Sequence, residues 1–519
     1  MLGELVSFRG RYRTLHLTWF AFFLSFVVWF NYAPLATTIQ EDIGLTDAQR
    51  GIVGLCNVAL TVPARIIIGM LLDKYGPRVT YSVLLMYAVI PCTLFATAND
   101  FTTLVISRLL LGIVGAGFVI GIRMVAEWFP PKEIGLAEGI YGGWGNFGSA
   151  ASALSLVAIA GAFSFLPGAF ALESGAILNW RMAIFATGAF AAIYGAIYFF
   201  SVSDTPEGKT YQRPTRHGGI EVTSRGDFFF LLLMNVPLTG VMMLLAWRLK
   251  KAGLYGDPVM LSIWAVLGAI YLFQAYNCWQ ANRELMIGTK HYPQEDRYSF
   301  SQVAILELTY IVNFGSELAV VTMLPLFFEQ VFGFSKFWAG IIASSYAFMN
   351  LMSRPGGGLI SDKLGSRKWT MAVLTAGMGL GYLVMGTLSG GVLPVLAVIV
   401  VMACSFFVQA GEGSTFAIVP LVKRRITGQV AGNVGAYGNV GAVLYLTLWT
   451  LLPKAEATGA SSSTFFFTLG GAALFVAVIC ALFLQEPKGS FAELHEGEEA
   501  TAPTVAGGAQ QLSNRTGSY

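Results

Sequence analysis

The sequence predicts an all-α membrane protein that crosses the bilayer many times and is built from two six-helix halves. Hydrophobic residues make up 55% of the 519 residues and charged residues only 12%, about half the charged share of a soluble domain. Apolar runs of membrane-spanning length recur along the chain. Two motifs of the first half also return in the second, which predicts halves related by pseudo-two-fold symmetry. These observations exclude a soluble globular protein.

Twelve apolar runs reach the length of about 20 residues that a membrane-spanning helix needs. They are continuously apolar, whereas the strands of a membrane barrel alternate over about ten residues, so we expect helices. The expected spans are 15–36, 51–72, 80–98, 102–126, 136–165 and 178–201, then 302–328, 337–360, 370–389, 392–420, 427–453 and 464–485. The first run is too long for a signal-peptide core, so we expect it to be retained as a helix.

These spans divide the chain into five parts. They are an N-terminal segment (1–14), a first half (15–201), a central insertion (202–301), a second half (302–485) and a tail (486–519). The insertion carries two further apolar runs, 227–247 and 258–277, which we expect to form a hydrophobic hairpin that spans the membrane. A shallow or re-entrant hairpin is the alternative, because the basic residues at 248–251 would otherwise face outward. The tail is acidic and then rich in Gly, Ala, Ser and Thr, which predicts disorder.

Basic residues in the short loops indicate how the chain is oriented. Clusters at 9–13, 74–78, 363–368 and 423–425 fall on one side of the predicted bundle, and the turns around Asn99 and Gly390 on the other side hold no basic residue. Short basic loops are retained in the cytoplasm. We therefore expect a multi-pass protein of the cell (plasma or inner) membrane with both termini cytoplasmic.

The composition also excludes several functional classes. The net charge is only +3 and the basic residues form short clusters rather than one stripe, which excludes a nucleic-acid partner. The five cysteines are odd in number and lack CxxC spacing, so we expect buried free thiols rather than disulfides or metal ligands. The sequence has no P-loop and no HExxH motif, so we expect no enzymatic activity, metal or cofactor. The expected state is a monomer in membrane lipid.

An internal repeat points to a site. An arginine is followed eight residues later by an aspartate and then by a second arginine, once as Arg65, Asp73 and Arg78 and again as Arg354, Asp362 and Arg367. A glycine-rich helix with one deep asparagine also occurs twice, as Gly135, Gly139, Gly142, Gly145, Asn146 and Gly148 and again as Gly428, Gly432, Gly435, Gly438, Asn439 and Gly441. Bare glycine faces let helices approach closely, but packing does not explain a buried amide.

The depth of the repeated arginines predicts an anion site. Eight residues place Arg65 and Arg354 about 12 Å from the basic loops, near the middle of a hydrocarbon core of roughly 30 Å. Asn146 and Asn439 reach a similar depth, about 16 Å from their helix starts. A guanidinium at that depth needs a water-filled cavity, an anion or a carboxylate. The alternative to an anion is an ion pair with Glu317 or Glu412 from another helix.

The loops D-K-Y-G-P-R and D-K-L-G-S-R resemble the loop signature of the major facilitator superfamily. This resemblance implies a transporter scaffold and identifies no substrate. Their Asp and Arg residues, at 73, 78, 362 and 367, are better interpreted as gate and topology determinants than as ligands, since they lie at helix ends.

A narrower resemblance follows from G-I-Y-G-G-W-G-N-F-G and G-N-V-G-A-Y-G-N-V-G, which are similar to the twin motifs of the nitrate/nitrite porter family. Tyr310, the F-G-S at 314–316 and the G-E-G-S-T-F at 411–416 are also similar to segments of that family. The resemblance implies that Arg65 and Arg354 clamp nitrate or nitrite. It further implies that Tyr310 and Asn146 add hydrogen bonds, and we expect the same of Asn439 from the repeat. For a flat ion we also expect aromatic walls from Phe314, with Trp144 and Tyr437 as further candidates.

Five carboxylates lie in or near the predicted spans: Glu127, Glu138, Glu307, Glu317 and Glu412. Glu127 follows Arg123 by four residues, so we expect that pair to form an ion pair on one helix face. Glu317 and Glu412 have no local partner and are the candidates for proton coupling, against a structural role in hydrogen bonding. We favour proton-coupled nitrate uptake; a nitrate/nitrite exchanger, a carrier of another small anion and a non-transporting nitrate sensor are the alternatives.

Overall fold

The computed structural model describes residues 2–173, 175–214, 218–452 and 460–494, and these are almost entirely helical. The predicted disordered tail lies outside the described residues from 495 onward. One small antiparallel sheet joins β1 (Phe170–Ala171) to β2 (Ile177–Leu178), with Phe170 opposite Leu178. Short 3-10 helices are η1 (Leu2–Glu4), η2 (Ala33–Leu35), η3 (Ile113–Ala116), η4 (Pro131–Glu133), η5 (Gln294–Asp296) and η6 (Arg424–Ile426).

The first half makes six passes. Its helices are α1 (Gly10–Trp29), α2 (Ala36–Ile43), α3 (Asp47–Ala59), α4 (Thr61–Tyr75), α5 (Pro77–Tyr87), α6 (Val89–Ala96), α7 (Phe101–Gly112), α8 (Gly117–Trp128), α9 (Ile134–Ala162) and α10 (Trp180–Ser201). Several passes are broken into two helices, and the predicted span 51–72 is divided between α3 and α4 at Leu60.

The helices of the second half are α13 (Phe300–Val312), α14 (Phe314–Phe332), α15 (Lys336–Phe348), α16 (Asn350–Lys363), α17 (Arg367–Gly386), α18 (Pro394–Val422), α19 (Thr427–Leu451) and α20 (Ala460–Phe483). In this half, five helical stretches among the described residues are long and apolar enough to cross a membrane, and the stretch formed by α15 and α16 is not one of them. The break at Asn313 has a local cause, because its side chain accepts a hydrogen bond from the Phe314 N–H and so caps α14. Met349 separates α15 from α16, which correspond to the predicted span 337–360.

Between the halves lie α11 (Arg225–Lys251) and α12 (Asp257–Ile287). Thirteen helical stretches among the described residues are long and apolar enough to cross a membrane, and both of these helices are among them. α11 packs against α19 and α13, where the Tyr437 hydroxyl donates to the Met234 carbonyl. Since length and apolarity alone do not place a helix in a bilayer, the spanning hairpin stays a prediction.

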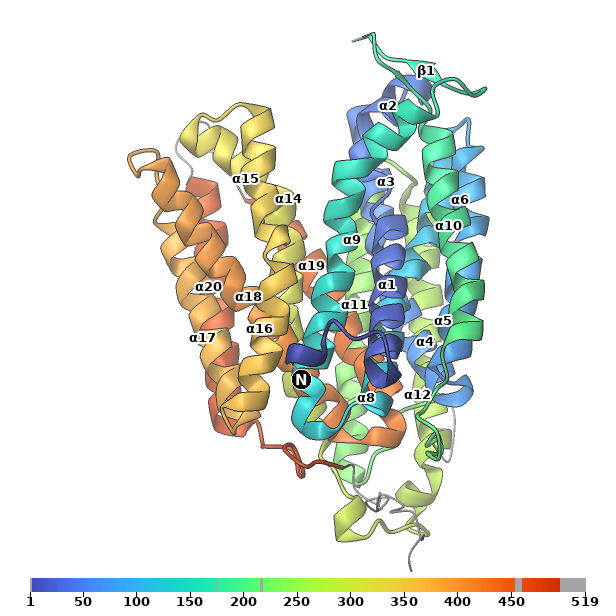
Figure 1. Cartoon of the computed structure of the whole chain (residues 1–519), viewed down its shortest axis with the longest axis vertical. Coiled ribbons are helices and arrows are strands. Elements are labelled where there is room, and N and C mark those ends of the chain that lie inside the picture. Colours follow the sequence, from blue (N-terminus) through green and yellow to red (C-terminus); the bar gives the residue numbers. More distant parts are fainter. Residues whose placement is uncertain (1, 174, 215–217, 453–459, 495–519) are drawn as a thin grey trace, which may run out of the picture.

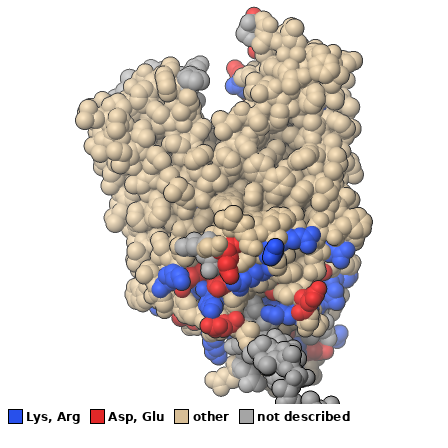
Figure 2. Space-filling model, in the orientation of Figure 1, with Lys and Arg blue, Asp and Glu red and all other residues tan. Residues whose placement is uncertain are grey.

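The two halves stand side by side, meeting near one end of the bundle and separating at the other (Figure 1). Figure 2 shows Lys and Arg gathered toward the end where the halves meet, and a cleft between the halves at the opposite end. We name these the basic end, defined by the loops at 74–78, 363–368 and 423–425, and the open end. A site between the halves is therefore closed toward the basic end.

Glycines allow the halves to touch at the basic end. α9 packs against α16, and α4 against α19. A Cβ at Gly358 would overlap the carbonyl oxygen of Gly135, and a Cβ at Gly69 would overlap that of Gly428. Since these close approaches join helices of opposite halves, the repeated glycines serve closure as well as packing.

Gly358→Ala tests this contact. The new Cβ would hold α16 away from α9, and we expect the free energy of unfolding to fall by about 1–3 kcal/mol, as for other overpacked interiors. The measurement is the thermal unfolding midpoint of the purified protein in detergent. Gly356→Ala is the matched control, because a Cβ there meets only Phe406 at 3.9 Å. Equal effects of the two substitutions would contradict the prediction.

Candidate functional site

Arg65 and Arg354 lie buried between the halves, each contacting the glycine-rich helix of the other half. The Arg65 guanidinium donates to the Gly435 carbonyl at 2.5 Å and to the Gly115 carbonyl at 3.4 Å. Arg354 lies against α9, where a Cβ at Gly142 would come within 2.7 Å of its Nε. The two contacts are related by the repeat, because Gly142 and Gly435 occupy equivalent positions in the two halves.

Aromatic rings form the remaining surface around the two arginines. The guanidinium carbons of Arg65 and Arg354 lie over the same ring, Phe118, at 5.5 and 5.2 Å. Arg65 also lies 5.3 Å from the Phe314 ring, which stacks on Tyr310 at 5.1 Å. The Tyr310 hydroxyl accepts a hydrogen bond from Arg354 at 3.0 Å. Four residues predicted for the site therefore lie together.

Phe118 is a site residue that sequence reasoning missed. Its ring is parallel to that of Tyr310, 6.0 Å away, and meets Phe416 edge-on. The only sequence signal was an aromatic residue within the glycine-rich run at 112–121. By contrast, Trp144 packs with Trp19 and His16, and Tyr437 faces α11, so these two aromatic candidates contact other parts of the fold.

The two arginines differ in their carboxylate partners. Arg354 forms an ion pair with Glu412 at 2.8 Å, so the alternative of an ion pair holds for this arginine. Among the described residues, Arg65 has no carboxylate within the 4.0 Å of an ion pair. Glu317 accepts hydrogen bonds from Asn350 at 2.5 Å and Gln409 at 3.2 Å. Arg354 therefore has a carboxylate within ion-pair distance, whereas Arg65 has none among the described residues.

The asparagines of the repeat lie one helical turn beyond the glycines that contact the arginines. Asn146 follows Gly142 by four residues, and Asn439 follows Gly435 by four. Both are buried, and neither side-chain oxygen has a hydrogen-bond partner among the described residues. Asn439 donates weakly to the Gly435 carbonyl at 3.5 Å. The unpaired atom of each amide is therefore its acceptor oxygen, and an anion would have to bind the NH2 donor of the same group.

The repeated aspartates close the basic end. Asp73 accepts hydrogen bonds from the backbone N–H groups of Gly428 and Gln429, both at 2.9 Å. Asp362 accepts from Gly135 at 3.0 Å and Leu136 at 2.7 Å. Each carboxylate thus caps the first turn of a helix in the opposite half, where free N–H groups and the helix dipole favour negative charge.

The arginines of the two loops differ in their contacts. Arg367 forms an ion pair with Asp362 at 2.9 Å. Arg78 instead donates to the Phe199 carbonyl at 2.7 Å, and its backbone N–H binds Asp204. Arg78 therefore ties α5 to the end of α10 within its own half, and the two loops are not equivalent.

In the first half, Arg78 does not pair with Asp73. A buried series of ion pairs begins at Asp73 instead. Arg123 lies 3.9 Å from Asp73 and 2.8 Å from Glu127, so the predicted pair of Arg123 with Glu127 is present. Glu127 also binds Arg424 of the second half at 2.8 Å. The series therefore crosses between the halves.

The described residues of 204–224, which we name the strap, cross the same end. Arg123 donates to the Tyr211 hydroxyl and the Gln212 carbonyl, and Glu221 accepts from Arg425 at 2.9 Å. Burial alone would raise the pKa of Glu221, but the hydrogen bond from Tyr292 and the charge of Arg425 outweigh it and hold the pKa below its ordinary value. Glu221 is therefore ionised at neutral pH, and the strap joins both halves.

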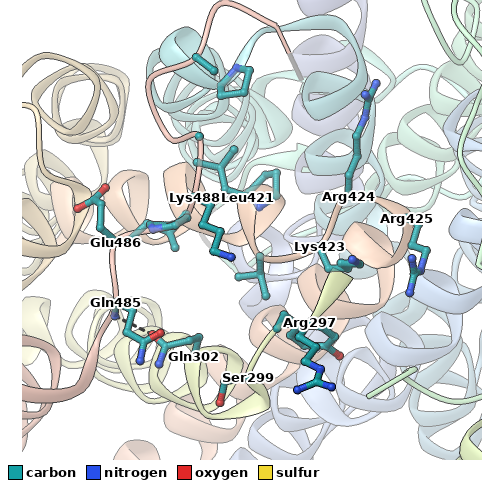
Figure 3. Close-up of a pocket in the computed structure, with 18 of the residues that line it drawn as sticks. Arg297, Ser299, Gln302, Leu421, Lys423, Arg424, Arg425, Gln485, Glu486 and Lys488 are labelled. Carbon is teal, nitrogen blue, oxygen red and sulfur yellow. Dashed lines mark hydrogen bonds between the residues drawn. The ribbon is translucent and has the colours of Figure 1, made fainter. Parts of the chain in front are cut away.

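A cavity of about 390 Å³ opens beside these contacts, and neither Arg65 nor Arg354 lines it. Figure 3 shows Lys423 and Lys488 reaching into it, with Gln485 bonded to Gln302 at its edge. Lys423 and Arg425 already bind Asp296 there. The cavity therefore lies at the basic end, apart from the arginine pair.

Comparison with known proteins identifies relatives of the whole chain. The Major Facilitator Superfamily family model matches residues 18–304 and 306–515. The chain is 66% identical over 526 residues to the nitrate/nitrite transporter NrtP of a Picosynechococcus strain, covering 97% of this chain and 98% of that protein. It is 53% identical to the transporter of the same name from Nostoc punctiforme, covering 97% and 98%. The solved proton:xylose symporter XylE shares the fold, with a TM-score of 0.59 at 14% identity over 92% of this chain and 97% of that one.

Glu127→Gln tests the series of ion pairs at the basic end. Removing this charge leaves Arg123 and Arg424 without their shared partner, and we expect a loss of about 3–5 kcal/mol in stability, as for other broken buried pairs. The thermal unfolding midpoint in detergent measures it. Glu133→Gln is the control, because Glu133 pairs with Arg11 in a partly exposed position and should cost about 0–1 kcal/mol. The prediction fails if the control variant is the less stable of the two.

Proposed function

The chain belongs to the Major Facilitator Superfamily and, within it, to the nitrate/nitrite porter family, and on that premise we propose that it carries nitrate, and nitrite with it, across the cell membrane by alternating access. The observation that carries the proposal is the pair of buried guanidiniums, one from each half, over the ring of Phe118. An anion held between the halves is exposed to one side or the other as the halves rock.

The charge of the site suits a monovalent anion. Glu412 compensates Arg354, while Arg65 has no carboxylate partner among the described residues. One anion therefore balances the remaining charge in a region where water is excluded. Nitrate and nitrite offer hydrogen-bond acceptors only, which matches donor-only guanidiniums, the Tyr310 hydroxyl and the amide groups of Asn146 and Asn439. The parallel rings of Phe118, Tyr310 and Phe314 favour a flat ion.

The arrangement of the halves supports one state of such a cycle. The basic end is closed by Asp73, Asp362 and the ion pair of Glu127 with Arg424. A cleft separates the halves at the other end (Figure 2). If the basic end faces the cytoplasm, as the loop charges predict, this is the outward-facing state, and the two aspartates act as gate residues that release their helix ends when the carrier turns inward.

Glu412 gives a physical route to proton coupling. When Glu412 takes a proton from outside, its ion pair with Arg354 is lost and the guanidinium becomes free to bind the anion. After the anion leaves on the inner side, the acid gives up the proton and pairs with Arg354 again. Importing one anion against an inside-negative potential costs about 2.3 kcal/mol per 100 mV, so uptake needs such coupling. Glu317 remains a second candidate, but its bonds to two amides favour Glu412 for this role.

Tracer nitrate uptake into proteoliposomes tests the proposed function. We expect uptake that rises with an inward pH gradient and does not need nitrite inside. Electroneutral exchange that requires internal nitrite and ignores the pH gradient would instead identify an exchanger. A folded protein that binds nitrate and moves none would be a sensor.

Arg65→Lys and Arg354→Lys test the two-arginine clamp. A lysine keeps the charge but loses the planar fork of donors, so we expect nitrate binding to weaken more than tenfold, about the loss of one charge-assisted hydrogen bond or more. Isothermal titration of the purified variants gives the dissociation constants. Wild-type affinity in either variant would refute the clamp.

Asn146→Ala and Asn439→Ala test the amides. Each substitution removes a donor assigned to the anion, and we expect affinity to fall by about 1.5–3 kcal/mol, roughly ten- to a hundredfold, with little change in unfolding temperature. Loss of folded protein with normal affinity in what remains would show that the asparagines serve packing instead.

A further inference from the structure

The inserted hairpin and Tyr437 have no role in the transport cycle described above, and the two are in contact. Tyr437 lies in the second twin motif, where it corresponds to Trp144 of the first. Trp144 donates to the Leu351 carbonyl at 3.2 Å and so joins α9 to a helix of the opposite half. Tyr437 instead donates to the Met234 carbonyl of α11. The hairpin therefore contacts α19 through the equivalent of a residue that joins the halves.

A proline explains why α11 accepts a hydrogen bond at this turn. Pro237 lies inside α11 and has no N–H group, so a carbonyl of the preceding turn loses its bond along the helix. Such a break opens the turn to donors from other helices. The Met234 carbonyl, three residues before Pro237, accepts from Tyr437 there.

α11 is bonded to the second half at three levels. At the basic end, Asp227 accepts from the backbone N–H of Phe300, the first residue of α13. Tyr437 binds α11 near its middle, and Arg248 donates to Thr447 near the end of α19 at 3.2 Å. Among the described residues, α11 makes no hydrogen bond or ion pair with the first half. Its polar contacts outside the insertion are therefore all with the second half.

The contact of α11 with the first half is apolar and lies beside Arg65. One buried cluster joins α11 (Leu238 and Val241), α4 (Val62) and α19 (Ala436, Tyr437, Val440 and Val443). Val62 lies one helical turn before Arg65, and Tyr437 lies two residues after Gly435, whose carbonyl binds Arg65. α11 therefore covers the line of contact between α4 and α19 at the level of the anion site.

The two kinds of contact decide which half the hairpin follows. α4 and α19 belong to different halves and move against each other as the halves rock, so α11 stays fixed to one of them only. Hydrogen bonds hold a helix in one register, whereas apolar contact is non-directional and allows sliding. The outer face of α12 is apolar, with Ile270 55% and Phe273 65% exposed, as contact with lipid requires.

We infer that the hairpin α11–α12 spans the membrane as a side wall of the carrier, fixed to the second half. The wall keeps lipid away from Arg65, and α4 of the first half slides beneath it in each cycle. Without it, lipid tails would reach the line of contact between α4 and α19, next to a guanidinium that needs water or an anion. The inference rests on the proposed carrier function.

Reversible cross-links test which half the wall follows. Arg248→Cys with Thr447→Cys joins α11 to the second half, and Leu238→Cys with Val62→Cys joins it to the first. A short bis-methanethiosulfonate reagent links each pair, and dithiothreitol removes the link. Tracer nitrate exchange between two nitrate-loaded sides of proteoliposomes is measured in both forms. The first link should leave the exchange rate unchanged, and the second should abolish it until dithiothreitol restores it.

Controls separate a locked carrier from a damaged one. Each single-cysteine variant should exchange nitrate with and without the reagent, and the five native cysteines are buried. The variant linked through Val62 should still bind nitrate, because the link forms while the open end is accessible. Val241→Cys replaces Leu238→Cys if that variant fails to fold.

A lipid with a photoactivatable group in its acyl chain tests the wall without transport, with labelled residues identified by mass spectrometry. In the wild type it should label Phe273 of α12 and Ile67 of α4, which is 52% exposed. It should spare Val62 of the same helix, which is 2% exposed, and Leu238. Labelling of Val62, or none on α12, would overturn the wall.

The possible results also distinguish the inference from the proposed function. Absence of nitrate exchange in the wild type would overturn the carrier, and the lipid labelling would still decide whether the hairpin covers α4 within the membrane. Exchange that stops with the link to Thr447, or continues with the link to Val62, would overturn the attachment of the wall to the second half and leave the carrier intact.

Discussion

Positive charge held in the middle of a low-dielectric bundle is the constraint on which much of this structure depends. Arg65 and Arg354 are both buried, and the guanidinium of Arg65 is satisfied partly by the opposite half, whereas that of Arg354 is satisfied within its own half. Arg65 reaches a backbone carbonyl of α19, and Arg354 reaches Tyr310 and Glu412. Bare glycine faces on α9 and α19 make room for these side chains. The pair is left with a single excess charge, and that charge is what an anion can balance.

At the basic end the buried charges are negative instead of positive, and they too need partners in the interior. Asp73 and Asp362 bury their charge against free N–H groups at the start of a helix in the other half. Such contacts hold only while the halves touch, because each aspartate and its helix belong to different halves. Whether the two aspartates keep these hydrogen bonds therefore depends on whether the halves touch at the basic end. The ion pair of Glu127 with Arg424 and the strap strengthen closure on the side of the first half.

The halves are alike in backbone but not in chemistry. Arg367 binds its own aspartate, whereas Arg78 turns to the end of α10 and leaves Asp73 beside Arg123. Arg354 has a carboxylate partner and Arg65 has none among the described residues. Glu138 of α9 corresponds in the repeat to an alanine, Ala431, in α19. A duplicated scaffold thus carries different charged groups at equivalent positions of its two halves.

The sequence by itself determined the helical membrane fold and the repeat, because hydrophobic run length is a local property, and it predicted one shared layer for Arg65 and Arg354 from the helical rise. Tyr310 and Phe314 were found through a family resemblance, and the pair of Arg123 with Glu127 through its four-residue spacing. Only the tertiary structure decided that Phe118 lies under both arginines, that Glu412 pairs with Arg354, and that Asp73 caps α19. Those contacts join residues from different helices, and spacing along one chain does not specify which faces meet. The sequence predicted that charged side chains are buried. The partner of each charge depended on how the helices of the two halves pack.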